Sequence, residues 1–130
     1  MSAWRGYAVV GLGSGLGSLS RHQLGVWLAT PGFPWATLAV NLLGSALIAL
    51  FAAWAAHREH GRVARWQPFL VAGFCGGFTT FSLFGLETLA LMGQGRAAAA
   101  LGYVALSLVA WLGAAWAGDH AGRRQAARRP

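Results

Sequence analysis

The sequence predicts an all-α membrane protein that forms a single domain over residues 1–130 and crosses the bilayer four times. Hydrophobic residues make up 56% of the chain and charged residues only 10%, whereas about 25% of the residues of a soluble domain are charged. A membrane span needs about 20 mainly apolar residues. Runs of this kind recur between short polar breaks, at Trp4–Thr30, Pro34–Ala56, Pro68–Gly93 and Ala97–Gly118.

The first run carries glycines at alternate positions. They lack the G-x-G-x-x-G spacing of a dinucleotide-binding loop, and no second βαβ element or acidic ribose contact follows. Glycines four residues apart allow membrane helices to pack closely. We therefore interpret these glycines as helix-packing positions: Gly11, Gly13, Gly15 and Gly17.

Arg21 lies inside the same run, where a charged side chain is costly and usually faces protein or water. Two interpretations stay open on chemistry alone. The side chain can extend toward the membrane interface, or it can place a positive charge in a water-filled vestibule and raise the local concentration of anions.

Polar side chains in the second and fourth runs are spaced four residues apart, so each set lies on one helix face. The second run contains Thr37, Asn41 and Ser45, and the fourth contains Tyr103, Ser107 and Trp111. Such a face can be a seam between helices that is held by hydrogen bonds, or it can line a hydrated path. The sequence leaves both possibilities open.

The third run is expected to be broken near mid-membrane. Gly76 and Gly77 weaken the helix, and the hydroxyl residues that follow, Thr79, Thr80 and Ser82, can satisfy freed backbone groups. Non-helical backbone at this depth is tolerated only where protein or a water-filled cavity covers it. Carbonyl oxygens released by a break can bind a hard cation such as Na⁺.

Phe81 and Phe84 follow the expected break, and Glu87 shares the face of Phe84. Paired phenylalanines in a span are usually core or lipid-facing residues. Their ring edges nevertheless carry partial positive charge and could contact a small anion. An ionised Glu87 would repel that anion, which counts against the simplest anion pore.

All ten basic residues other than histidine are arginines, and four spans place most of them on one side of the membrane. That side carries eight: Arg5, Arg58, Arg62, Arg65, Arg123, Arg124, Arg128 and Arg129. The other side carries Arg96 and, at most, Arg21. Positive loops stay cytoplasmic, so we expect cytoplasmic termini and anionic lipid, rather than nucleic acid, as the partner of these charges.

The spans contain no Ser/His, Asp/Asp or His/Glu arrangement, which argues against an enzyme. Cys75 is the single cysteine, so an intrachain disulfide is excluded. A small multidrug-resistance-type transporter with dual topology needs a glutamate in its first span, whereas Glu87 lies in the third. A subunit that conducts nothing, with Thr37 and Asn41 as packing contacts, is a further alternative.

Three stretches together resemble the CrcB/Fluc family of fluoride channels. "GFCGGFTTFSLF" (Gly73–Phe84) resembles the third-span signature of that family, "NLLGS" (Asn41–Ser45) its second-span motif and "GSLSRHQL" (Gly17–Leu24) its first-span arginine segment. The resemblance implies a passive F⁻ channel in the bacterial plasma membrane that lowers cytoplasmic fluoride and protects against its toxicity. It also implies an antiparallel, dual-topology dimer with a structural Na⁺ at its centre.

The resemblance also implies roles for individual residues. Na⁺ would be bound by the backbone carbonyls of Gly76 and Thr79. Arg21 would lie near the vestibule, and Thr37 and Glu87 would belong to a polar track. The remaining residues would line the fluoride pore: Asn41, Phe81, Ser82, Phe84, Tyr103 and Ser107.

The chain departs from the family pattern in two respects. Leu83 occupies the position of a family threonine, which removes a hydroxyl from the polar track beside Glu87. Dual topology also needs nearly balanced positive charge, whereas the arginines here are strongly biased to one side. We therefore expect this chain to pair with an oppositely oriented homologue rather than only with a second copy of itself.

Overall fold

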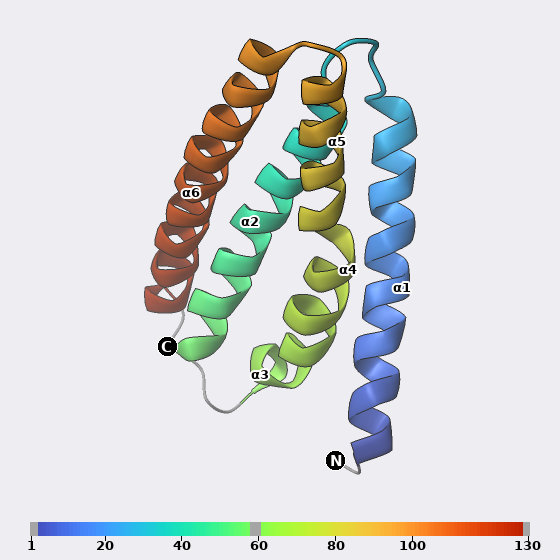
Figure 1. The fold of residues 1–130 in the computed structure, drawn as a ribbon. Helices are drawn as coiled ribbons and strands as arrows, with labels where there is room; N and C mark the ends of the chain where they lie inside the picture. The colour runs from blue at the N-terminus through green and yellow to red at the C-terminus, as the bar shows by residue number, and fades with distance from the viewer. Residues whose placement is uncertain (1–2, 58–60, 129–130) are drawn as a thin grey trace.

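The computed structural model describes residues 3–57 and 61–128, and all regular elements in these ranges are helical (Figure 1). The prediction of an all-α fold is confirmed for this part of the chain. Arg58 and Arg129, which the charge count included, lie outside the described residues. The elements are α1 (Ala3–Trp27), α2 (Trp35–Ala56), α3 (Arg62–Gln67), the π-helical segment η1 (Pro68–Cys75), α4 (Gly76–Phe78), α5 (Phe81–Gly93) and α6 (Ala97–Ala127).

Three helical stretches are long and apolar enough to cross a membrane, namely Trp35–Ala56, Ala64–Gly93 and Ala97–Ala127. They correspond to the second, third and fourth predicted spans. Helix α1 has 25 residues and, at 1.5 Å per residue, is about 37 Å long, which is also sufficient. Its glycines, serines and arginines dilute its hydropathy, so composition alone does not identify α1 as a span.

The third span is broken at Thr79 and Thr80, close to the middle of the Ala64–Gly93 stretch. Thr79 (φ −81°, ψ 154°) and Thr80 (φ −147°, ψ 118°) are both extended. Gly76 and Gly77 are helical, so the expectation that these glycines break the helix is corrected. Threonine branches at Cβ and is well suited to extended backbone, whereas glycine merely permits it.

Glycines allow two pairs of helices to pack at close range. Helix α1 lies against η1 and α4, and α2 lies along α6 (Figure 1). A Cβ atom added at Gly13 would lie 2.5 Å from the Phe69 carbonyl oxygen, and one at Gly122 would lie 2.5 Å from the Leu50 carbonyl oxygen. A Cβ atom added at Gly11 or Gly15 would meet nothing within 4 Å, so among the described residues the predicted packing seam uses only the Gly13/Gly17 pair.

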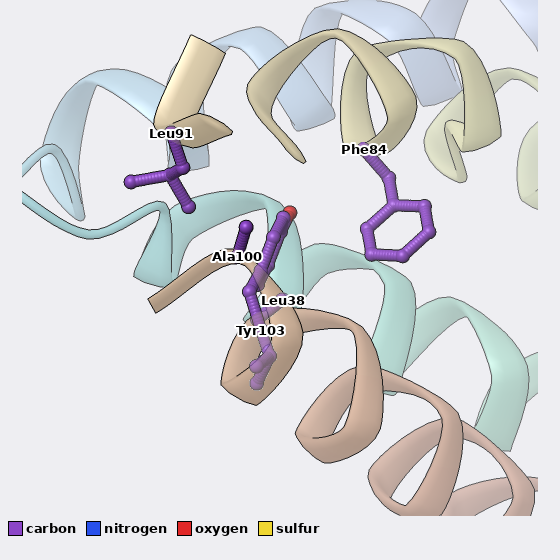
Figure 2. Close-up of a cluster of buried hydrophobic side chains, with 5 residues drawn as sticks. All are labelled: Leu38, Phe84, Leu91, Ala100 and Tyr103. Carbon is purple, nitrogen blue, oxygen red and sulfur yellow. The ribbon is translucent and has the colours of Figure 1, made fainter. Parts of the chain in front are cut away.

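A buried apolar cluster joins the helix after the break to the α2–α6 pair. Figure 2 shows its members projecting from α5, α2 and α6 toward one another. Phe33, Ala99, Val104 and Trp111 pack around them. This cluster positions α5 independently of α4, so the break joins two separately anchored half-helices. Its buried residues are Leu38, Phe84, Leu91, Ala100 and Tyr103.

Candidate functional site

Asn41 holds the broken segment of the third span against α2. Its Nδ2 donates to the Thr80 carbonyl oxygen at 2.7 Å, and its Oδ1 accepts from the Thr80 backbone N–H at 2.8 Å. The side-chain amide thus pairs with Thr80 as a neighbouring strand would. Gly44, one turn later on α2, leaves room for Thr79. A Cβ atom at this position would clash with the Thr79 methyl group and would lie 3.3 Å from Cδ1 of Phe78.

The break withdraws the helical hydrogen-bond donors from two carbonyl oxygens. In a continuous α-helix the N–H of Thr80 would bond to Gly76 and that of Leu83 would bond to Thr79. Here the Thr80 N–H donates to Asn41, and the Leu83 N–H donates to Thr80 Oγ1 at 3.2 Å. Gly76 is exposed. The two carbonyl oxygens that lose these donors are the ones that the family resemblance implied as Na⁺ ligands, and oxygen is the donor type that hard cations take.

Arg21 lies on the α1 side of the same break. Its Nε donates to the carbonyl oxygen of Gly77 at 3.3 Å, and Ser18 Oγ donates to the same oxygen at 3.2 Å. A cation at the C-terminal end of a half-helix is favourable because carbonyl groups point toward it. Arg21 also lines an open hollow of about 390 Å³ that reaches Thr80. Sequence reasoning missed Ser18, whose one available signal was its place one turn before Arg21.

Phe81 and Phe84 have different surroundings. Their ring centroids lie 5.5 Å apart at an interplanar angle of 48°. Phe84 is only 6% exposed and packs on Tyr103 and Trp111, with centroid distances of 5.0 and 4.8 Å. Phe81 is 75% exposed in the isolated chain. Phe84 is therefore held in place by its neighbours, whereas Phe81 presents its ring outward beside the exposed Ser82.

A second hollow, of about 200 Å³, is lined by Phe81 and Asn41. Thr79, Thr80, Ser45, Ile48 and Trp111 complete its walls. The Trp111 Nε1 donates to the Leu38 carbonyl oxygen at 3.4 Å. The hollow is thus lined by aromatic residues together with residues that carry hydroxyl and amide groups.

Glu87 connects three helices through its two carboxylate oxygens. Oε1 accepts from Thr37 Oγ1 of α2, and Oε2 accepts from the Tyr103 hydroxyl of α6, both at 2.8 Å. The sequence placed Thr37 and Tyr103 on polar faces but did not show that both meet Glu87. Ser107 is fully buried, and its Oγ has no hydrogen-bond partner within the described chain.

The chain matches a family model described as CrcB-like protein, Camphor Resistance (CrcB), over residues 8–119. Among similar curated proteins, the fluoride-specific ion channel FluC of Paracoccus denitrificans (strain Pd 1222) is 47% identical, with coverage of 88% of this chain and 91% of the relative. The FluC of Paramagnetospirillum magneticum (strain ATCC 700264 / AMB-1) is 48% identical over 82% of this chain and 91% of the relative. The FluC 1 of Bradyrhizobium diazoefficiens is 44% identical, covering 88% and 84%.

Proposed function

The chain belongs to the CrcB family, and we infer from this membership that it is a fluoride-specific ion channel of a bacterial membrane. It is a multi-pass protein and a channel rather than an enzyme. Passive export of F⁻ across the plasma membrane would lower the fluoride that accumulates when the neutral acid HF enters and dissociates.

The arrangement around the helix break supports this function. Fluoride is small and strongly hydrated, so a pore must replace its water with donors and weakly positive groups without binding the ion too tightly. The edge of the exposed Phe81 ring and the groups around the hollow at Asn41 offer such contacts. We propose Phe81, Ser82 and Asn41 as direct pore contacts, with Phe84 holding Phe81 in place.

We propose a structural Na⁺ at the carbonyl oxygens of Gly76 and Thr79. The redirected N–H groups of Thr80 and Leu83 support this proposal, because they leave both oxygens without their helical donors. A cation held there would neutralise the carbonyl dipoles of the break and fix the two half-helices relative to each other. The dimer, in which each copy would contribute its own break to one cation, is part of the same proposal.

We further propose that α1 also crosses the membrane, which brings the number of spans to four, and that the arginine-rich end of the bundle lies in the cytoplasm. The start of α1, helix α3 and the end of α6 lie at the same end of the molecule (Figure 1). The described arginines at that end are Arg5, Arg62, Arg65, Arg123, Arg124 and Arg128, whereas the turn between α5 and α6 carries Arg96. Such a bias favours a single orientation, so the antiparallel partner would be a homologue with the opposite bias.

The decisive experiment is fluoride efflux from liposomes that contain this protein alone, followed with a fluoride electrode, with chloride efflux measured in parallel. Whichever liposomes release fluoride, those with this protein alone or those with an added homologue of opposite charge bias, we expect them to retain chloride and to lose the fluoride release in Phe81→Ile. Phe51→Ile, on α2 away from the break, serves as a matched control. Release of chloride at a similar rate, or full activity of Phe81→Ile, would contradict the proposed pore.

The same assay separates the two possible dimers. Release by the protein alone would establish a homodimeric channel and show that the arginine bias does not impose one orientation. Release that appears only after an oppositely biased homologue is added would make the chain one half of a heterodimer. No release in either case would contradict the inferred channel function.

A further inference from the structure

Two adjoining open hollows lie where α1 faces α2 and α5. The first, of about 390 Å³, reaches from Arg21 to Thr80, and the second, of about 300 Å³, reaches Glu87. Their walls share five residues, and we call this shared part of the wall the neck: Gly25, Ala29, Ala36, Thr37 and Leu83.

A third hollow continues this trough toward the turn between α5 and α6. It has a volume of about 260 Å³ and extends to Gln94 and Arg96. It shares four lining residues with the second hollow, namely Thr30, Phe33, Pro34 and Glu87. The trough therefore begins near one arginine, Arg21, and ends near another. Anions are drawn to the arginine at each end, whereas the Glu87 carboxylate between the two ends opposes an anion.

Leu83 is the one large apolar side chain in the neck. The other four residues carry a hydrogen atom, a methyl group or, at Thr37, a hydroxyl. Leu83 follows Thr80 by three residues and precedes Glu87 by four, which places its side chain on the face between these polar groups. It is half-buried and lines both hollows.

We propose that Leu83 is the apolar restriction in the ion path of this channel and limits its fluoride conductance. The proposal rests on the function inferred above. An ion at the neck can gain hydrogen bonds from Thr37 only, and the Thr37 hydroxyl already donates to Glu87. Narrow apolar positions also lose their water, so fluoride passing Leu83 gives up hydration without a replacement.

The test compares Leu83→Thr with Leu83→Val in the liposome efflux assay. Threonine and valine have nearly the same shape, so the pair isolates the hydroxyl from the loss of side-chain volume. Leu86→Thr is the matched control, because Leu86 lies on the same helix, is 64% exposed and lines none of the three hollows. Gel filtration of each variant ensures that equal amounts of folded protein are compared.

We expect Leu83→Thr to release fluoride roughly three- to tenfold faster than Leu83→Val, the range that corresponds to one hydrogen bond of ordinary net strength. Leu86→Thr should match the unmodified protein, and chloride should be retained in all variants. Equal rates for the threonine and valine variants, or chloride release by Leu83→Thr, would overturn the proposal while leaving the channel function intact. A parent protein that releases no fluoride, alone or with a homologue, would instead contradict the function on which the proposal rests.

Discussion

The amide of Asn41 maintains the extended backbone at Thr80, and its removal should loosen the break. Asn41→Ala deletes both hydrogen bonds to Thr80, the donated one at 2.7 Å and the accepted one at 2.8 Å. Asn41 is 5% exposed, so water cannot readily replace the lost partner. Each hydrogen bond contributes about 0.5–1.5 kcal/mol, so the loss of both should lower the free energy needed to open the segment by about 1–3 kcal/mol.

Hydrogen–deuterium exchange measured by mass spectrometry on the protein in nanodiscs tests this value. A loss of about 1–3 kcal/mol should accelerate amide exchange in a peptide that covers Thr79 to Leu83 by roughly 5- to 150-fold. Ser45→Ala provides the matched control, since Ser45 lies one turn further along the same face of α2 and makes no side-chain hydrogen bond within the described chain.

The reasoning would be refuted if Asn41→Ala and Ser45→Ala gave the same exchange at the break. Acceleration spread evenly over α5 and α6 would also count against it, because that pattern indicates general unfolding rather than release of Thr80. If the break does open locally, fluoride efflux should fall in Asn41→Ala, since Phe81 follows the released residue directly.

Two further predictions concern packing and the Glu87 contacts. Gly17→Ala should lower the thermal unfolding temperature, because the added Cβ meets the Phe74 backbone. Gly15→Ala should leave that temperature unchanged or raise it slightly, because its added Cβ would meet nothing within 4 Å. Equal effects of the two substitutions would contradict the packing assignment. Tyr103→Phe deletes the bond to Glu87 Oε2 and should destabilise the protein by about 1 kcal/mol. A double-mutant cycle of unfolding should show no such loss in the background of Glu87→Ala, which lacks the acceptor.

The architecture could be predicted largely from the sequence, because it depends on local patterns. Long apolar runs indicated the helices, and the third run was correctly expected to contain a break. Which glycines pack could not be predicted. Gly11/Gly15 and Gly13/Gly17 have the same spacing, and only the position of η1 relative to α1 places one pair in contact and the other on an exposed face.

The contacts of the candidate site were less predictable, because they join residues far apart in the chain. Helical spacing showed that Thr37 and Asn41 share a face, and the structure places both beside the broken span. No local pattern connects Thr37 and Tyr103 to the same carboxylate, 50 and 16 residues away in sequence. Such pairs become visible only once α2, α5 and α6 are assembled around Glu87.

The residues at which the third span breaks are hard to infer from the sequence of that span alone. Gly76 and Gly77 are the weakest helix formers of that region, yet they remain helical, and Gly77 is buried against Ser14 of α1. The backbone leaves the helix only at Thr79–Thr80, where Asn41, 39 residues away, pairs with Thr80. The glycines therefore provide close contact with α1, whereas the threonines together with Asn41 release the carbonyl oxygens. It follows that substitutions at Gly77 should disturb helix packing first and that substitutions at Asn41 should disturb the proposed cation site first, although both positions border the same break.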